Sequence, residues 1–192
     1  RLRYLNDAQE LANLLNELKA PYIYSDFRGK QLSFFADTNN IRRRCKTFRL
    51  CKKHGGYREI TAPKGRLHDV LHILNIVLQT YDEPTPWAYG FVCGRFVVDN
   101  ARPHVGKRYI LNLDLKNFFP TIKRRQVADC LMAEPFGFSS LAAELVSGLA
   151  TVRMDNGEEV LAQGFATSPT LSNFICREMD KEIAGVAAAQ GV

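Results

Sequence analysis

The sequence predicts an α+β protein in which antiparallel hairpins pack against helices. Two segments, 47–61 and 152–160, place strand-forming residues on either side of a glycine-containing centre, which is typical of hairpins. Three longer segments, 67–81, 123–132 and 139–151, have the apolar content or spacing of helices. A chain of 192 residues with 46% hydrophobic residues is long enough for one real core or for two lobes of a larger enzyme.

The N-terminal region is predicted to begin with a helix that Asn6 or Asp7 can cap and that Pro21 ends. Its apolar stripe consists of Leu11, Leu14, Leu15 and Leu18. Residues 22–36 are expected to form short strands or loop. Further along the chain, the apolar segment 67–81 is expected to form a buried helix.

The first hairpin is strongly basic. Residues 42–66 hold ten Lys or Arg residues and a single acid, Glu59. Glycines at the tip let a ligand approach the backbone, and Arg offers a fork of donors while Lys offers a point charge. The residues predicted to bind a triphosphate are Lys52, Lys53 and Arg58. The alternative is a solvated basic hairpin that contacts nucleic-acid backbone without specificity.

The apolar run Tyr109–Leu115 has the length of a β-strand and carries one carboxylate, Asp114, near its end. An unpaired carboxylate is costly to bury, so Asp114 faces water or has a cation. Phe119 follows five residues later, and Pro120 stops the strand. Nucleotidyl transfer uses two divalent ions, and magnesium needs only one or two protein carboxylates, so a lone Asp is a usable ligand. The alternative is a strand-end Asp that makes a cap or a salt bridge.

The C-terminal part combines a hairpin, a loop and a helix. Asn156-Gly157 predicts a type I′ turn. Gln163-Gly164 is expected to form a loop in which Gln163 can bond a base or sugar. Ser168-Pro169 is expected to begin a helix that runs to about residue 184, with free N–H groups directed towards an anion. An ordinary loop followed by a capped helix is the alternative.

The ordered set of basic hairpin, Asp strand with an aromatic at plus five, Gln-Gly loop and Ser-Pro helix resembles the reverse transcriptase family, its bacterial branch above all. The resemblance covers roughly residues 45–185. It implies that Asp114 and the Leu115 carbonyl bind the catalytic magnesium ions and that Phe119 excludes a 2′-hydroxyl. It further implies that Gln163 and Gly164 contact nucleotide and template, and that Arg58 with Lys52 or Lys53 holds the triphosphate.

The resemblance also implies partners: an RNA template, a DNA or RNA primer, deoxynucleoside triphosphates and, in some branches, a structured RNA or a role in antiviral defence. The candidate nucleic-acid contacts are Arg42, Arg43, Arg44, Ser168, Pro169 and Asn173. Asn100-Ala101 and His104 are similar to an Asn-Ala-x-x-His element of retron reverse transcriptases, with a plain turn as the alternative; group II intron enzymes are the other related branch.

By the same resemblance, residues 1–108 would form an N-terminal helix and fingers, and residues 109–192 a partial palm with an antiparallel sheet packed on helices. The family's Tyr-x-Asp-Asp hairpin, expected soon after the Ser-Pro helix, is absent up to Val192, and the chain starts at Arg1. We therefore expect an inactive N-terminal fragment whose uncovered sheet edge favours a homodimer.

Composition fits this interpretation. The net charge is +6 and the pI is 9.1, which favours anionic partners. The five cysteines are odd in number and irregularly spaced, as in reduced cytoplasmic proteins. No apolar run approaches the roughly 18–20 residues of a membrane span, so no membrane partner is expected.

Other interpretations remain open at this point. His68 and His72 lie one helical turn apart, but packed or capped histidines are the better explanation than zinc ligands. Four aromatic residues can stack on bases or pack in the core, namely Trp87, Tyr89, Phe91 and Phe96. The alternatives to a reverse transcriptase are a non-catalytic nucleic-acid-binding or self-associating module and an untemplated nucleotidyltransferase on the same fold.

Overall fold

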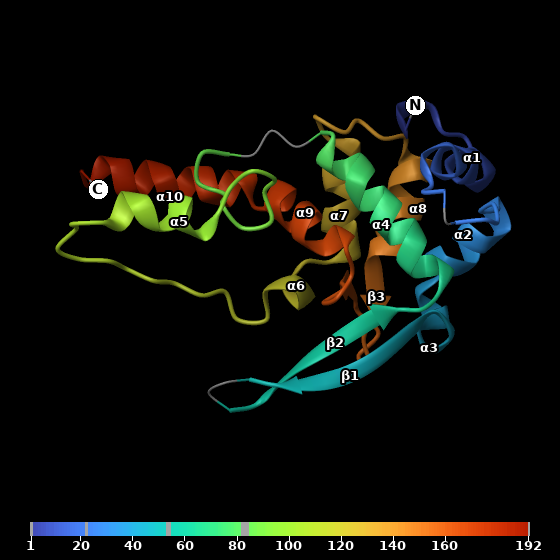
Figure 1. The fold of residues 1–192 in the computed structure, drawn as a ribbon, viewed down its shortest axis with the longest axis horizontal. Helices are drawn as coiled ribbons and strands as arrows, with labels where there is room; N and C mark the ends of the chain where they lie inside the picture. The colour runs from blue at the N-terminus through green and yellow to red at the C-terminus, as the bar shows by residue number, and fades with distance from the viewer. Residues whose placement is uncertain (1, 22, 53–54, 82–84, 192) are drawn as a thin grey trace.

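The computed structural model describes residues 2–21, 23–52, 55–81 and 85–191 and confirms a mixed helix and sheet architecture (Figure 1). The helices are η1 Leu2–Tyr4, α1 Ala8–Leu18, α2 Gly29–Ala36, η2 Thr38–Asn40, α3 Ile41–Arg44, α4 Arg66–Gln79, α5 Val97–Ala101, η3 Arg102–His104, α6 Phe118–Thr121, α7 Arg124–Met132, α8 Ser140–Ala150, α9 Thr167–Ile175 and α10 Arg177–Ala189. The strands are β1 Cys45–Cys51, β2 Tyr57–Pro63, β3 Thr151–Arg153 and β4 Glu159–Leu161, in two antiparallel pairs.

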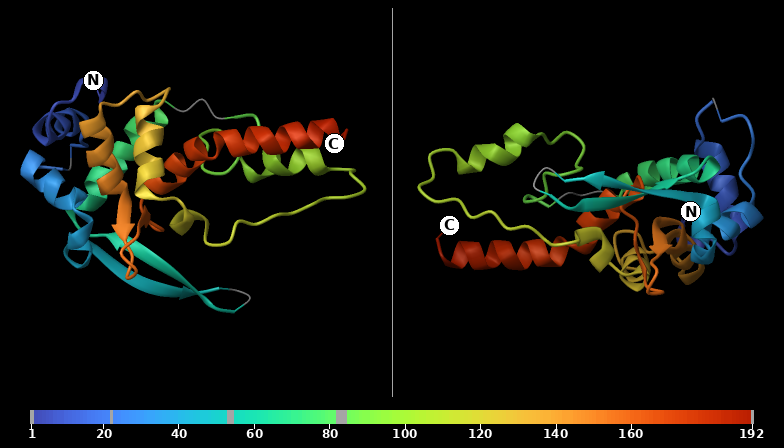
Figure 2. Two further views of the ribbon diagram at one scale, coloured as in Figure 1. Left: turned by 180° about the vertical axis from the view of Figure 1, so that it is seen from behind. Right: turned by 90° about the horizontal axis from the view of Figure 1, so that it is seen from below.

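Six helices form the body of the molecule: α1, α2, α4, α7, α8 and α9 (Figures 1 and 2). Their buried side chains join one continuous apolar cluster that runs from Leu2 to Phe174. The β1–β2 hairpin runs along one side of this body, and its tip, α10 and the segment around α5 all extend towards the same end of the long axis. The cluster therefore draws on both sides of the predicted boundary at residue 108, and that boundary stays a prediction.

The predicted N-terminal helix is confirmed as α1, where the Asp7 side chain accepts a hydrogen bond from the Glu10 N–H at 2.8 Å. The prediction of short strands or loop for residues 22–36 is confirmed as loop for residues 23–28 but is wrong for residues 29–36, which form α2. This helix approaches α1 very closely at Gly29, where a Cβ would lie 2.7 Å from the backbone nitrogen of Gln9. Packing of α2 on α1 thus overrides the weak helix propensity of glycine.

Both predicted hairpins are present. In the first, β1 pairs with β2 over seven residue pairs, from Cys45 opposite Pro63 to Cys51 opposite Tyr57. The second hairpin, β3–β4, does not have the predicted type I′ turn, since Gly157 but not Asn156 has a positive φ. Its ends are joined instead by a three-residue loop, closed by a 2.8 Å bond from the Met154 N–H to the Glu158 carbonyl.

The predicted strand Tyr109–Leu115 is wrong for this structure. The segment is extended, but within the described residues it pairs with no strand. Its apolar side chains face solvent, with Leu111 and Leu113 each 80% exposed. A strand is stabilised by hydrogen bonds to a neighbour and by a covered apolar face, and both are missing here.

The predicted C-terminal helix is divided in two. Helix α9 begins at Thr167, one residue before the expected Ser168 cap, and α10 follows after a break at Cys176. Helix α10 has no buried residues and projects from the body (Figure 1). Across the described ranges, no helix is both long and apolar enough to cross a bilayer.

Candidate active site

A cleft of about 550 Å³ lies between the basic hairpin, the segment 114–120 and the β3–β4 hairpin. Figure 1 shows α6 and β3 beside β2 at this position. Six of the residues predicted for nucleotide or metal binding line it: Lys52, Arg58, Asp114, Leu115, Phe119 and Gln163. Lys53, also predicted, lies outside the described residues. The fold therefore brings together side chains that are up to 111 positions apart in the sequence, from Lys52 to Gln163.

The β1–β2 hairpin presents the two cations at its outer half. Arg58 lies opposite Leu50 on the partner strand, and Lys52 follows the end of β1. The tip turns because Gly55 and Gly56 have φ values of 88° and 80°, which favour glycine. The Lys52 N–H donates to the Gly56 carbonyl at 3.0 Å. Both cationic side chains are exposed, so they can neutralise a bound anion with little desolvation.

The Gln163-Gly164 loop is fastened to β2. The Thr61 N–H donates to the Gln163 carbonyl at 2.8 Å. With its amide oriented to match its neighbours, Gln163 donates to the Glu59 carbonyl and accepts from Arg58 Nε, each at 3.2 Å. Gly164 has a φ of 119°, and a Cβ there would lie 2.8 Å from the Thr61 carbonyl oxygen. Glycine is therefore required at this position by backbone conformation and by close approach.

Asp114 and Phe119 reach the cleft from either side of a sharp bend. Asn117 has a left-handed backbone with a φ of 52° and precedes the short helix α6. Phe119 is half-buried and its ring centroid lies 5.5 Å from that of Phe118. The Ile122 carbonyl, just after α6, accepts a 2.8 Å bond from the Leu161 N–H of β4. Phe119 is thus anchored through β4, whereas Asp114 lies in the extended, exposed segment.

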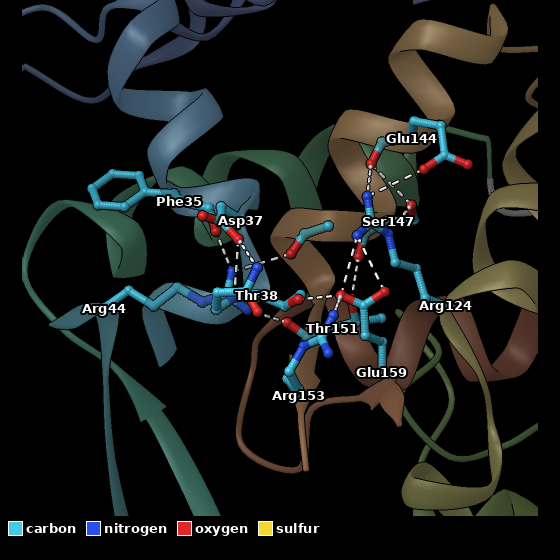
Figure 3. Close-up of polar contacts among 12 residues, drawn as sticks. Phe35, Asp37, Thr38, Arg44, Arg124, Glu144, Ser147, Thr151, Arg153 and Glu159 are labelled. Atoms are coloured by element: carbon cyan, nitrogen blue, oxygen red, sulfur yellow. Dashed lines mark hydrogen bonds and ion pairs between the residues drawn. The ribbon is translucent and has the colours of Figure 1, made fainter. Parts of the chain in front are cut away.

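Arg44 does not have the predicted role in nucleic-acid binding. Its side chain is 1% exposed and donates to the carbonyls of Phe35, Gly148 and Thr151, which joins α2, α8 and β3 (Figure 3). Burial lowers the pKa of the guanidinium from its usual value. A charge held inside the body by three carbonyls supports the fold and is not available to a phosphate.

A second polar centre lies beside Arg44 at Glu159 (Figure 3). The Glu159 carboxylate accepts the Thr38 hydroxyl and pairs with Arg124 at 3.3 Å and Arg153 at 3.5 Å. Burial alone would raise the pKa of Glu159, but the Thr38 hydroxyl and the two guanidinium groups outweigh it and hold the pKa below its usual value. This centre fixes the β3–β4 hairpin to η2 and α7.

The remaining predicted nucleic-acid contacts are scattered. Ser168 is buried and donates to the Ala162 carbonyl at 2.6 Å, so that prediction is wrong. The Asn173 amide donates to the Gly90 carbonyl at 2.9 Å. Pro169 is half-buried, whereas Arg42 and Arg43 are exposed on α3, away from the lining of the cleft. The roles expected of Arg42, Arg43, Pro169 and Asn173 stay predictions.

The subclass residues Asn100, Ala101 and His104 are exposed on α5 and η3 and do not line the cleft. The stacked rings of His68 and His72, with centroids 5.8 Å apart, lie exposed on α4, so they are not packed in the core. In the described part of the chain, no group of three or more His, Cys, Asp or Glu residues could hold a metal ion.

Phe91 is the lining residue that sequence reasoning placed least clearly. It lies in the cleft with Asp114 and Phe119, although Trp87, Tyr89 and Phe96 are equally plausible candidates from the sequence alone. Spacing could not separate these four aromatics, because an irregular loop and not a periodic element positions them.

Comparisons with known proteins agree with the ordered motifs. No family model matches the chain. It is 35% identical over 156 residues to the retron Mx65 reverse transcriptase of Myxococcus xanthus, which covers 76% of this chain and 36% of that protein. It is 31% identical over 108 residues to the retron Ec86 reverse transcriptase of Escherichia coli, covering 56% and 32%. It is also 31% identical over 156 residues to the Myxococcus xanthus retron Mx162 enzyme, covering 73% and 31%.

The chain thus spans about a third of the length of these three relatives. These relatives are of the same family that the ordered motifs of the sequence resemble. The chain belongs to the family of bacterial retron reverse transcriptases.

Proposed function

We propose that the protein carrying this chain is an RNA-directed DNA polymerase and that the cleft binds the incoming deoxynucleoside triphosphate. The observation that carries the proposal is the gathering of two cations, the exposed carboxylate of Asp114, the Phe119 ring and Gln163 in one cleft, in a chain related to retron enzymes. Its partners would be an RNA template and a primer.

One wall of the cleft carries Lys52 and Arg58 and is called the cationic wall here. It would hold the triphosphate. Arg58 can offer two parallel donors to phosphate oxygens, and Lys52 can place its charge beside them. The Gln163 side chain bonds both Arg58 and the β2 backbone, so it limits the orientations of the Arg58 guanidinium. Fewer side-chain conformations need to be lost when the phosphate binds.

Asp114 and the Leu115 carbonyl would hold the magnesium ions. Within the described residues, Asp114 makes no hydrogen bond or ion pair, so both carboxylate oxygens are open to a cation. The bound ions supply charge that activates the attacking hydroxyl and stabilises the pyrophosphate leaving group. The other carboxylate of the cleft, Glu59, pairs with Arg49 at 3.8 Å. One free carboxylate makes a weak site, so we expect residues 1–192 alone to be inactive.

Phe119 would select the sugar. A phenyl ring anchored through α6 and β4 excludes the additional hydroxyl of a ribonucleotide by its volume. Phe119→Ala should therefore admit ribonucleoside triphosphates. Unchanged selectivity in competition between the two sugars would count against this role.

Self-association is a separate proposal. The segment 105–115 exposes unpaired backbone and the apolar side chains of Ile110, Leu111 and Leu113. Such an edge can pair with a second copy of the chain. A monomer by light scattering at high concentration of residues 1–192 would contradict it.

Primer extension on an RNA template by the full-length protein tests the proposed activity. Asp114→Ala should reduce incorporation by at least about 100-fold, in the range seen when one electrostatic group of an active site is removed. Asp129→Ala is the control, because Asp129 is exposed on α7, does not line the cleft and pairs with Arg125 on its own helix. Full activity of Asp114→Ala would refute the role. Nucleic-acid binding by the wild type without synthesis would favour the non-catalytic module.

A further inference from the structure

The loop 85–96 holds an aromatic ring in the cleft. Of its four aromatic residues, Trp87, Phe91 and Phe96 are 49%, 66% and 69% exposed. Phe91 is the one among the four that lines the cleft, together with Asp114 and Phe119. The next residue, Val92, is buried, so the loop as a whole packs against the body while the Phe91 side chain stays exposed.

The loop is fixed by its own polar contacts. The Arg95 guanidinium donates to the carbonyls of Thr85 and Ala88 and lies 5.5 Å from the Tyr89 ring centroid. From α9, the Asn173 amide donates to the Gly90 carbonyl at 2.9 Å. These contacts hold the loop on both sides of Phe91, which follows Gly90 and lines the cleft.

The backbone of Phe91 is also unusual. Its φ is 60°, in the left-handed region, which is unfavourable for a residue with a side chain but not for glycine. Packing does not explain this conformation, because two thirds of the side chain is exposed. A strained residue with an uncovered ring in a cleft is a pattern that points to a ligand.

We infer that the Phe91 ring stacks on a nucleobase held in the cleft and that Asn173 is a positioning residue that keeps the ring there. The inference rests on the proposed function. The cations Lys52 and Arg58 provide for phosphate, and a base offers an apolar face that needs a flat partner. The base belongs either to the incoming nucleotide or to the template strand, which present the same stacking surface.

Two fluorescent probes distinguish these sources. The first is 2-aminopurine deoxyriboside triphosphate, bound to the full-length protein with an unlabelled primer and template. The second is an RNA template with 2-aminopurine at the templating position. Phe91→Ala should weaken binding of one probe by about 5- to 100-fold, the range found when a stacking aromatic is replaced by alanine. Phe91→Trp should retain affinity, since it keeps a flat ring.

Phe96→Ala is the matched control, because Phe96 has the same side chain, belongs to the same loop and is equally exposed but does not line the cleft. It should bind both probes as the wild type does. Asn173→Ala should weaken the same probe as Phe91→Ala, and adding it to Phe91→Ala should cost no further affinity. A further loss in the double variant would mean that Asn173 contacts nucleic acid itself and would overturn its positioning role.

The stacking role is overturned if Phe91→Ala binds both probes like the wild type, if Phe96→Ala loses as much, or if the wild type binds neither probe. Failure of the proposed function is separate. Loss of affinity in Phe91→Ala together with full synthesis by Asp114→Ala would leave the stacking site in place and remove Asp114 from catalysis.

Discussion

The two walls of the cleft are supported very differently. The wall formed by β2 and the Gln163-Gly164 loop is held by a main-chain bond at Thr61, by the Gln163 amide and by close contact at Gly164. The wall formed by the segment that carries Asp114 has no strand partner among the described residues. Leu111 and Leu113, just before Asp114, are each 80% exposed.

One wall of the cleft is therefore preorganised by the described residues themselves, and the other is not. The cationic wall is built onto the body through β3–β4, the buried Arg44 and the half-buried Glu159 (Figure 3). The Asp114 segment keeps its extended form without cover for its apolar side chains. We therefore expect mutations to change stability when they affect the first wall and to change stability little when they affect the second.

The largest expected effect is at Arg44. Arg44→Ala would remove the donor that three carbonyls share, two of them at buried contacts, and create a cavity, so the free energy of unfolding should fall by about 3–5 kcal/mol. Chemical denaturation measures it. Arg43→Ala, at the exposed neighbouring position on α3, should change stability by less than about 0.5 kcal/mol. Equal losses in the two variants would contradict the structural role of Arg44.

Gly164→Ala tests the contact between the loop and β2. A methyl group would collide with the Thr61 carbonyl in a backbone conformation that alanine avoids, so stability should fall by about 1–3 kcal/mol. The control is Gly185→Ala on α10, where a Cβ meets open space and alanine should stabilise the helix by up to about 1 kcal/mol. The same sign for both variants would argue against the close approach at Gly164.

The decrease in the free energy of unfolding at acid pH should depend on Glu159. Its pKa is lowered in the folded protein, so its contribution is present above the unfolded pKa, near the ordinary value of 4.5, and is lost as the pH falls through the folded pKa. We expect about 1 kcal/mol for this partly exposed group. Glu159→Gln should flatten the decline below pH 4.5, whereas Glu178→Gln on α10 should leave it unchanged. A decline of wild-type steepness in Glu159→Gln would sink this assignment.

The smallest effect is expected on the exposed wall. Leu111→Ser should change the unfolding free energy of residues 1–192 by less than about 0.5 kcal/mol, because the side chain is 80% exposed. Leu149→Ala, which removes a fully buried side chain, should cost about 2–5 kcal/mol in the same measurement. A loss of more than about 1 kcal/mol in Leu111→Ser would show that the segment is covered.

Periodic and turn patterns predicted most of the body correctly. Helices α1, α4, α7 and α8 and both hairpins follow from apolar spacing, caps and glycine signals that act over short distances. Helix α2 was missed because its start at Gly29 is set by packing on α1, which a local pattern does not contain. The strand Tyr109–Leu115 has the right residues, but a strand also needs a neighbour.

In the candidate site, too, local patterns predicted some residues, whereas others depend on tertiary contacts. Asp114, Phe119 and Gln163 could be selected from their order along the chain and do line one cleft. The burial of Arg44 and Ser168 could not be predicted, because arginine and serine are usually exposed and only tertiary contacts reveal the exception. Phe91 likewise depends on a loop conformation that Arg95 and Asn173 determine.

Replacing Arg58 and measuring nucleotide affinity tests whether this cleft binds the triphosphate. In single-nucleotide incorporation by the full-length protein, Arg58→Ala should raise the KM for the deoxynucleoside triphosphate by about 10- to 100-fold, as expected for lost charge-assisted bonds. Arg49→Ala, on the same hairpin but outside the cleft, should leave the KM unchanged. An unchanged KM in Arg58→Ala, or an equal rise in Arg49→Ala, would contradict the account.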